Sequence, residues 1–178
     1  MLDLSMDKDH QEWELRVAEL WKRVESLQAG SLVAAVDALA DERDPGDAAA
    51  LFERACARDS AGRAPEAEPY YQAALATGEL DPSRRSRASI QLASTLRILG
   101  RLRESEQLLV GELERPVETG APRVLHDEAR ATLALTYVAQ GRPIEAAGLA
   151  LSALAPHLSR YNRSVSRNAA QLIAKTWS

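Results

Sequence analysis

A Gly-Arg pair recurs three times in this chain of 178 residues, and this recurrence constrains the fold more than any other feature. The glycines stand at positions 62, 100 and 141, so they are 38 and 41 residues apart. Each pair separates two segments whose apolar residues follow the helical period. A repeat of this length is typical of stacked helical hairpins. We therefore predict an array of helix-turn-helix units.

The segments beside the glycines carry apolar stripes. After the first glycine the apolar residues fall at i, i+3, i+4, i+7 and i+8, which is one face of a helix. They are Ala67, Tyr70, Tyr71, Ala74 and Leu75. The segment after the second glycine has a thinner pattern. The chain is 46% hydrophobic but only 4% aromatic, and its apolar residues are mostly Ala and Leu, which favour helices. The predicted fold class is all-α.

Prolines and one aspartate predict where helices begin. Pro65, Pro82, Pro122 and Pro143 each stand near the start of an expected helix, where the missing N–H of proline has no consequence. Asp81 is predicted to cap the helix that Pro82 opens. These positions agree with the boundaries that the glycines indicate.

Further helices are predicted at both ends of the chain. The first runs from about Asp7 to Gln28 and stops at Gly30, and Ser31 caps a second helix that extends to Ala40. A last helix, at 162–178, would cover the exposed end of the stack. The expected organisation is N-terminal helices at 1–44, three hairpins at 45–156 and a C-terminal capping segment at 157–178.

Charge is distributed unevenly along the chain. The net charge is -4, but residues 1–80 carry 17 acidic and 8 basic side chains, whereas residues 81–178 carry 9 and 14. Such asymmetry can steer head-to-tail contacts, and it is also common on solvated helices. A pI near 5.5 and the lack of a recognition motif argue against nucleic acid as a partner, despite the basic C-terminal segment.

No pattern predicts catalysis, a cofactor or a metal. His10, His126 and His157 lack the spacing that puts two ligands on one helical face, and Cys56 is interpreted as a small packing residue. The glycines form no phosphate-binding loop. Glutamates in the segment 104–114, Glu112 among them, are interpreted as a solvated face rather than an acid/base pair. We expect a protein that is not an enzyme.

Neither a membrane span nor a signal peptide is predicted. No apolar stretch approaches the roughly 18 residues that a span requires, and the first nine residues lack the basic and apolar pattern of a signal peptide. A cytoplasmic location is expected.

The repeats resemble the tetratricopeptide repeat family, in particular small bacterial proteins with three degenerate repeats. The third repeat carries the resemblance best, with Leu133, Ala134, Tyr137, Gly141 and Ala146 in the family's places. The first and second repeats match at fewer positions. The sequence departs from the family pattern at Glu112, where a small residue is expected, and no tryptophan opens any repeat.

This resemblance implies a right-handed superhelix of antiparallel helix pairs, in which the first helix of each pair lines a groove that binds a peptide or a helix of another protein. The groove residues that it implies are Ala49, Phe52, Cys56 and Asp59, then Arg87, Ile90, Ser94 and Arg97, then Glu128, Ala131, Leu135 and Val138. Within each helix they are three or four residues apart and so share one face. The set lacks the arrangement by which some family members bind a terminal carboxylate.

Two further hypotheses, one for the groove and one for the N-terminal helix, each have an ordinary alternative. Arg87 and Arg97 could attract an acidic group into the groove, or they could lie on a solvated face. At the N-terminus, one stripe could pair with a second copy to give a homodimer, or it could cap the first repeat. The residues of this stripe are Trp13, Val17, Leu20, Trp21 and Val24. The identity of the bound protein cannot be predicted from these residues.

Overall fold

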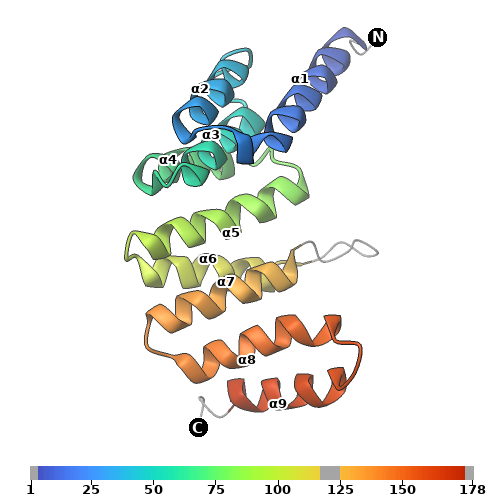
Figure 1. Cartoon of the computed structure of the whole chain (residues 1–178), viewed down its shortest axis with the longest axis vertical. Coiled ribbons are helices and arrows are strands. Elements are labelled where there is room, and N and C mark those ends of the chain that lie inside the picture. Colours follow the sequence, from blue (N-terminus) through green and yellow to red (C-terminus); the bar gives the residue numbers. More distant parts are fainter. Residues whose placement is uncertain (1–3, 117–124, 175–178) are drawn as a thin grey trace. The chain divides into compact units, whose positions relative to one another are not determined.

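The computed structural model describes residues 4–116 and 125–174 (Figure 1). In these ranges the chain forms helices and no strands, which confirms the all-α prediction. The helices are α1 (Leu4–Lys22), α2 (Ala29–Ala40), α3 (Ala48–Ser60), α4 (Ala64–Thr77), α5 (Pro82–Ile98), α6 (Leu102–Glu114), α7 (His126–Ala139), α8 (Pro143–Leu154) and α9 (Asn162–Ala174). Single 3-10 turns follow α1 and α8, at Val24–Ser26 (η1) and Ala155–His157 (η2).

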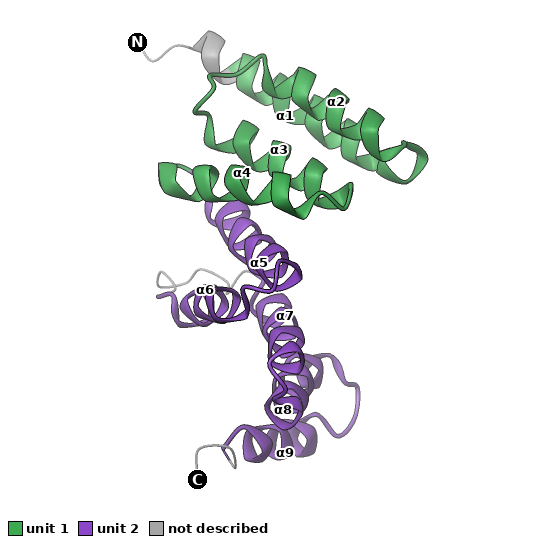
Figure 2. Ribbon diagram, turned by 90° about the vertical axis from the view of Figure 1, so that its left-hand side faces the viewer, with its two compact units in different colours: residues 1–79 green, residues 80–178 purple. Residues whose placement is uncertain are grey.

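The chain divides into two compact units (Figure 2). Unit 1 comprises residues 1–79 and holds α1 to α4. Unit 2 comprises residues 80–178 and holds α5 to α9. Each unit is described by itself.

The three Gly-Arg pairs form the same turn, as the repeat predicts. Gly62, Gly100 and Gly141 have φ values of 71°, 78° and 77°, a left-handed conformation that glycine adopts without strain. In each turn the backbone N–H of the following arginine donates, at 2.8 Å, to the carbonyl five residues before it. This 6→1 hydrogen bond closes the end of one helix. The next helix begins at the residue after the arginine.

The repeat is longer than the Gly-Arg pair, because each arginine also binds a glutamate three residues later. The motif is therefore Gly-Arg-x-x-Glu, in which the ion pair joins the residue before the helix to the first turn of that helix. The three ion pairs are Arg63–Glu66 at 3.7 Å, Arg101–Glu104 at 2.5 Å and Arg142–Glu145 at 2.6 Å. A carboxylate in the first turn also complements the positive end of the helix dipole.

The predicted helix starts are confirmed wherever the structure describes them. Pro82 and Pro143 are the first residues of α5 and α8, and Pro65 is the second residue of α4. The side chain of Asp81 accepts hydrogen bonds from the backbone N–H groups of Ser83 and Arg84, at 2.9 and 3.0 Å. Pro122 lies outside the described residues.

One predicted boundary is wrong. Gly30 does not end the first helix, and Ser31 does not cap the second, because α1 ends at Lys22 and α2 already begins at Ala29. The break lies at Leu27, whose backbone is extended, and at Gln28, the residue before α2. Gly30 lies in the first turn of α2, where several backbone N–H groups have no helical partner in any sequence.

The core of unit 1 joins α1, α2 and α3. Trp13 and Val17 pack with Ala40 and Ala50, and a second cluster contains Leu20, Leu32, Val33, Val36 and Ala57. An ion-pair network also joins α2 to α3. Asp37 accepts hydrogen bonds from Arg54 at 2.7 Å and from Arg58 at 3.0 Å. Burial opposes the charge of Asp37, but the two guanidinium groups outweigh it and hold the pKa of this carboxyl below its ordinary value.

In unit 2, α5, α6 and α7 share one core. Its buried residues are Ile90, Ala93, Leu109, Ala129 and Leu133. The next helices continue the stack, since α8 packs against α7 and α9 packs against α8. At Gly148 of α8 an added Cβ would lie 2.7 Å from Cγ1 of Ile173 and 3.1 Å from the carbonyl oxygen of Ala169. The close approach of α9 therefore requires glycine there, and α9 covers α8 as the predicted capping helix would.

Glu112 is not part of a solvated face, as the sequence had suggested, but is 8% exposed. Its carboxylate accepts a hydrogen bond from the Ser86 hydroxyl at 2.6 Å and another from Arg115 at 2.8 Å. Burial disfavours the charged form, yet these donors hold the pKa of Glu112 below its ordinary value. A glutamate is accommodated at this position of the repeat because α5 places a small hydroxyl residue, Ser86, opposite it.

Candidate partner-binding surface

The candidate site in unit 2 is a strip of exposed residues on α5 and α7, which we call the α5–α7 face. Both helices bury one side in the core that they share with α6, so each leaves the opposite side accessible. Residues three or four apart define the exposed side. On α7 they are Glu128, Ala131, Leu135 and Val138, and on α5 they are Arg87 and Ile98, with the partly exposed Gln91 and Ser94 between them.

The residues expected on this face are exposed on α7, and only some of those expected on α5 are exposed. All four expected residues of α7 are exposed, and Leu135 and Val138 have exposed fractions of 55% and 59%. On α5 the exposed strip contains Gln91 and Ile98, whereas the expected Ile90 is 9% exposed and belongs to the core. Successive residues of a helix are rotated by about 100°. A prediction that is wrong by one residue therefore places the core residue Ile90 on the surface.

The expected groove residues of α3 differ from those of α7, because two of the four, Phe52 and Cys56, are buried and the other two are partly exposed. Phe52 is 0% and Cys56 3% exposed. The Phe52 ring lies 6.2 Å from that of Tyr71, centre to centre, and the Tyr71 hydroxyl, which has one hydrogen to donate, lies 3.7 Å from Cys56 Sγ and 3.5 Å from a carboxylate oxygen of Asp59. Phe52 and Cys56 are therefore core residues of the first hairpin rather than exposed groove residues. Burial, with Cys56 and Asp59 nearby, raises the pKa of Tyr71.

Two arginines of α5 lie at the α5–α7 face, which also carries Glu128 of α7. Arg87 is exposed, and Arg97 is partly exposed beside Ser94, whose hydroxyl lies 3.4 Å from its guanidinium. The Nε atom of Arg97 is buried without a hydrogen-bond partner. Helix α5 contains four arginines and no acidic residue. Within the described ranges, no carboxylate forms an ion pair with Arg97.

The predicted self-association stripe of α1 lies inside unit 1. Trp13, Val17 and Leu20 are at most 5% exposed, and they pack on α2 and α3 as described above. The indole N–H groups donate within the chain, from Trp13 to the Leu39 carbonyl at 2.8 Å and from Trp21 to Glu53 at 2.6 Å. Val24, in η1, is partly buried against the same core. This stripe therefore covers the first repeat, which was the alternative interpretation.

Searches for other kinds of site gave no candidate in the part of the chain that is described. No three His, Cys, Asp or Glu side chains there are grouped closely enough to hold a metal ion. None of the described helices is both long and apolar enough to cross a membrane.

Comparisons with known proteins bear on the fold. A family model described as Tetratrico peptide repeat matches residues 48–172, which is more than half of the chain. Among solved structures, the chain is similar to the nearly identical TPR-like repeats of a candidate kinesin light chain from Podosopora anserina. The TM-score is 0.60 at 16% sequence identity, over 93% of this chain and 96% of that chain, and a variant of the same protein gives the same values. At this identity the likeness concerns the fold alone. No curated protein gives a significant match.

Proposed function

The chain belongs to the tetratricopeptide repeat family, and we propose that it is a protein-interaction scaffold whose α5–α7 face binds a peptide or helix of another protein. This family typically mediates contacts between proteins, and its helix pairs supply surface rather than reactive groups. The proposed site lies wholly within unit 2, on the first helices of the second and third hairpins.

The observation that carries this proposal is the exposure of large apolar side chains on the α5–α7 face. Ile98, Leu135 and Val138 are 60%, 55% and 59% exposed. Leu135 and Val138 are three residues apart on α7 and share one face, and Ile98 lies on the exposed side of α5. Apolar residues grouped in this way, with polar residues at their margin, are typical of a surface that another protein covers.

The chemistry of the face suggests what such a peptide contains. Apolar anchors would cover Leu135 and Val138, and an acidic group would approach Arg97 or Arg87. A guanidinium can donate two hydrogen bonds to one carboxylate, so an acid at this position adds orientation as well as affinity.

The test selects peptides from a random library displayed on phage, with purified protein as bait, and measures the best peptide by titration calorimetry. Leu135→Asp/Val138→Asp should weaken binding by at least about tenfold, since central apolar anchors each contribute more than about 1 kcal/mol. The matched control is Ile144→Asp/Leu154→Asp on α8, where two apolar residues are equally exposed, at 55% and 50%. Equal loss in both variants would contradict the proposed site.

A separate variant tests the acidic group. Arg87→Ala/Arg97→Ala should weaken binding at low salt and reduce its dependence on salt. If this variant binds as tightly as the wild type at low salt, the acidic component is removed from the proposal while the apolar site stands.

A further inference from the structure

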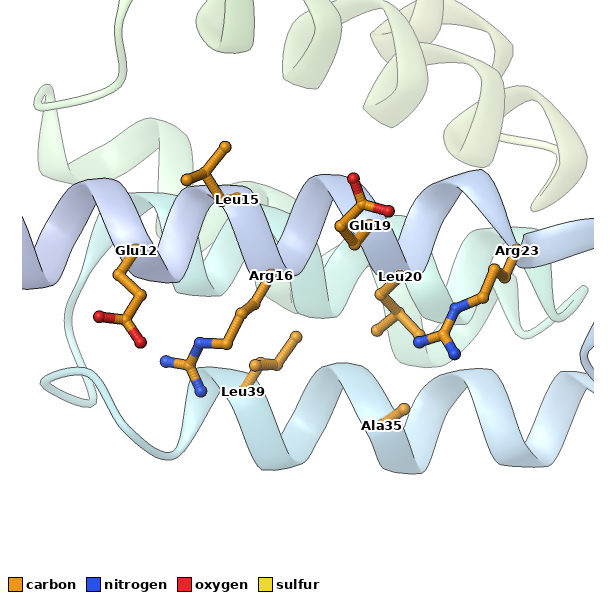
Figure 3. A pocket seen from close by; sticks show the side chains of 8 residues that line it. All are labelled: Glu12, Leu15, Arg16, Glu19, Leu20, Arg23, Ala35 and Leu39. Carbon is orange, nitrogen blue, oxygen red and sulfur yellow. The ribbon is translucent and has the colours of Figure 1, made fainter.

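A second surface lies in unit 1, where α1 and α2 enclose an open groove of about 440 Å³ (Figure 3). Leu20, Ala35 and Leu39 form its apolar floor, and Leu15, at the edge, is 68% exposed. Leu15 is as large as the leucines of the core, yet it packs against little of its own chain.

Charged side chains of alternating sign line the α1 side of the groove. They are Glu12, Arg16, Glu19 and Arg23, spaced by four, three and four residues, so they share one face. Figure 3 shows Arg16 and Arg23 extending from α1 across the groove toward α2. An apolar floor beside a charged edge is suited to an amphipathic helix.

The spacing of these charges is unchanged when α1 is read in reverse, and each position then carries the opposite sign. When two copies of α1 run antiparallel with the axis between Val17 and Ala18, Glu12 is level with Arg23 of the second copy. In the same way Arg16 is level with Glu19. Every charge in the set then meets its opposite. A parallel arrangement would place each charge level with its own copy, so it would be repulsive.

We propose that this groove is the interface of a homodimer, in which α1 packs antiparallel against α1 of a second copy about a twofold axis. A twofold interface uses the same patch on both copies, so its charge pattern must be self-complementary, and the α1 pattern meets that requirement. This proposal does not depend on peptide binding at the α5–α7 face.

Two of these charges already have partners within the chain. Arg16 donates to both carboxylate oxygens of Glu42, and Lys22 donates to Glu19 at 2.6 Å, and both pairs are exposed to solvent. Exposed pairs contribute little and exchange readily. Arg23 forms no ion pair with any residue in the described ranges. Contacts with a second copy would therefore give Arg16 and Glu19 a further partner and would give Arg23 an ion-pair partner.

The experiment uses two charge-reversal variants of the full chain, Glu12→Lys/Glu19→Lys and Arg16→Glu/Arg23→Glu. The first makes the face entirely basic, and the second makes it entirely acidic. Sedimentation equilibrium from about 5 to about 200 µM, the range of a small reversible interface, would measure association. Each variant alone should dissociate at least about tenfold more readily than the wild type, because like charges then face each other. An equimolar mixture of the two should form a heterodimer.

Heterodimer formation also controls for misfolding, because variants that do not fold cannot recover association on mixing. Asp44→Lys/Glu79→Lys is the matched control for the first variant, because it makes the same change in net charge at exposed positions of unit 1 that do not line the groove. It should associate as the wild type does. A wild type that is monomeric throughout would overturn the proposal and leave the groove to a different protein. A wild-type dimer that both reversals leave intact, or a mixture that fails to associate, would also overturn it.

Discussion

Arg142 contacts Tyr137 in two ways at the turn between α7 and α8. Its guanidinium carbon lies 3.7 Å from the centre of the tyrosine ring, and its backbone N–H donates to the Tyr137 carbonyl at 2.8 Å. The same guanidinium donates to Glu106 at 2.8 Å and to Glu145 at 2.6 Å. One side chain thus joins α6, α7 and α8, and these hydrogen bonds raise the pKa of Arg142.

Replacing Arg142 by alanine should lower the free energy of unfolding by about 1–2 kcal/mol, because a cation–π contact and two partly exposed ion pairs are lost. Urea denaturation would measure the change. Arg63→Ala is the control, since Arg63 occupies the same position of the motif but has one ion pair, at 3.7 Å. It should lose less than half as much. Equal losses would mean that the turn itself, rather than the Arg142 contacts, sets the effect.

Replacing each of three glycines by alanine should change the folding stability, and the sign of the change should differ among them. Gly141→Ala should destabilise the chain by about 1–2 kcal/mol, because alanine is strained at a φ of 77°. Gly148→Ala should also destabilise it, since the new Cβ would lie 2.7 Å from Ile173. Gly111→Ala should stabilise it by up to about 1 kcal/mol, because Gly111 lies within α6 and a Cβ there meets nothing within 4 Å.

Thermal and urea unfolding of the three glycine variants would test these signs together. Gly111 serves as the internal control for alanine itself, because the substitution is the same and only the surroundings differ. Stabilisation by Gly141→Ala would contradict the left-handed turn.

Acid should weaken the hydrogen bonds that the Glu112 carboxylate accepts from Ser86 and Arg115. Its pKa in the folded chain is below that in the unfolded chain, so its stabilisation is complete above the unfolded value of about 4.3 and is lost as the pH falls through the folded value. Glu112→Gln should lower the free energy of unfolding by about 1–3 kcal/mol at pH 7, because hydrogen bonds to a charged group are lost. The difference from the wild type should shrink as the pH falls from 7 toward 3.

Urea denaturation across this pH range would provide the comparison. Glu114→Gln, at an exposed position of the same helix, should leave both the stability and its pH dependence nearly unchanged. A difference for Glu112→Gln that is constant with pH would contradict the ionised, hydrogen-bonded carboxylate.

Phe52 and Leu135 were both predicted to contact a partner, and their replacement by alanine should separate core from surface. Phe52→Ala should cost about 3–5 kcal/mol of folding stability, because Phe52 is fully buried against Tyr71. Leu135→Ala should change stability by no more than about 0.5 kcal/mol, because its side chain is largely exposed. Chemical denaturation would measure both, and similar costs would contradict the assignment of Leu135 to the α5–α7 face.

The helical repeat could be predicted because its signals are local. A glycine that must adopt positive φ, a proline at a helix start and the Asp81 cap each act within a few residues, so the sequence displays them directly. The glutamate three residues after each arginine, at positions 66, 104 and 145, is equally visible in the sequence, but it was not part of the predicted repeat.

The features that could not be predicted depend on neighbouring helices. Whether Ile90 or Gln91 faces outward is decided by where α6 and α7 pack, and both residues fit one helix equally well. Glu112 is buried because Ser86, 26 residues away in the chain, lies opposite it. The α1 charges and the apolar floor of the groove also come from two helices, and only their packing places them together.

The single thiol of this chain, Cys56, is covered by Tyr71 and is 3% exposed. A thiol reagent should therefore react slowly with the folded protein and rapidly once α3 and α4 separate, since only local opening exposes the sulfur. The rate of modification would therefore measure how often the first hairpin opens, without any added probe. The same burial leaves a surface free of competing thiols, so a cysteine introduced at Ser94 could be labelled selectively while the native one remains silent.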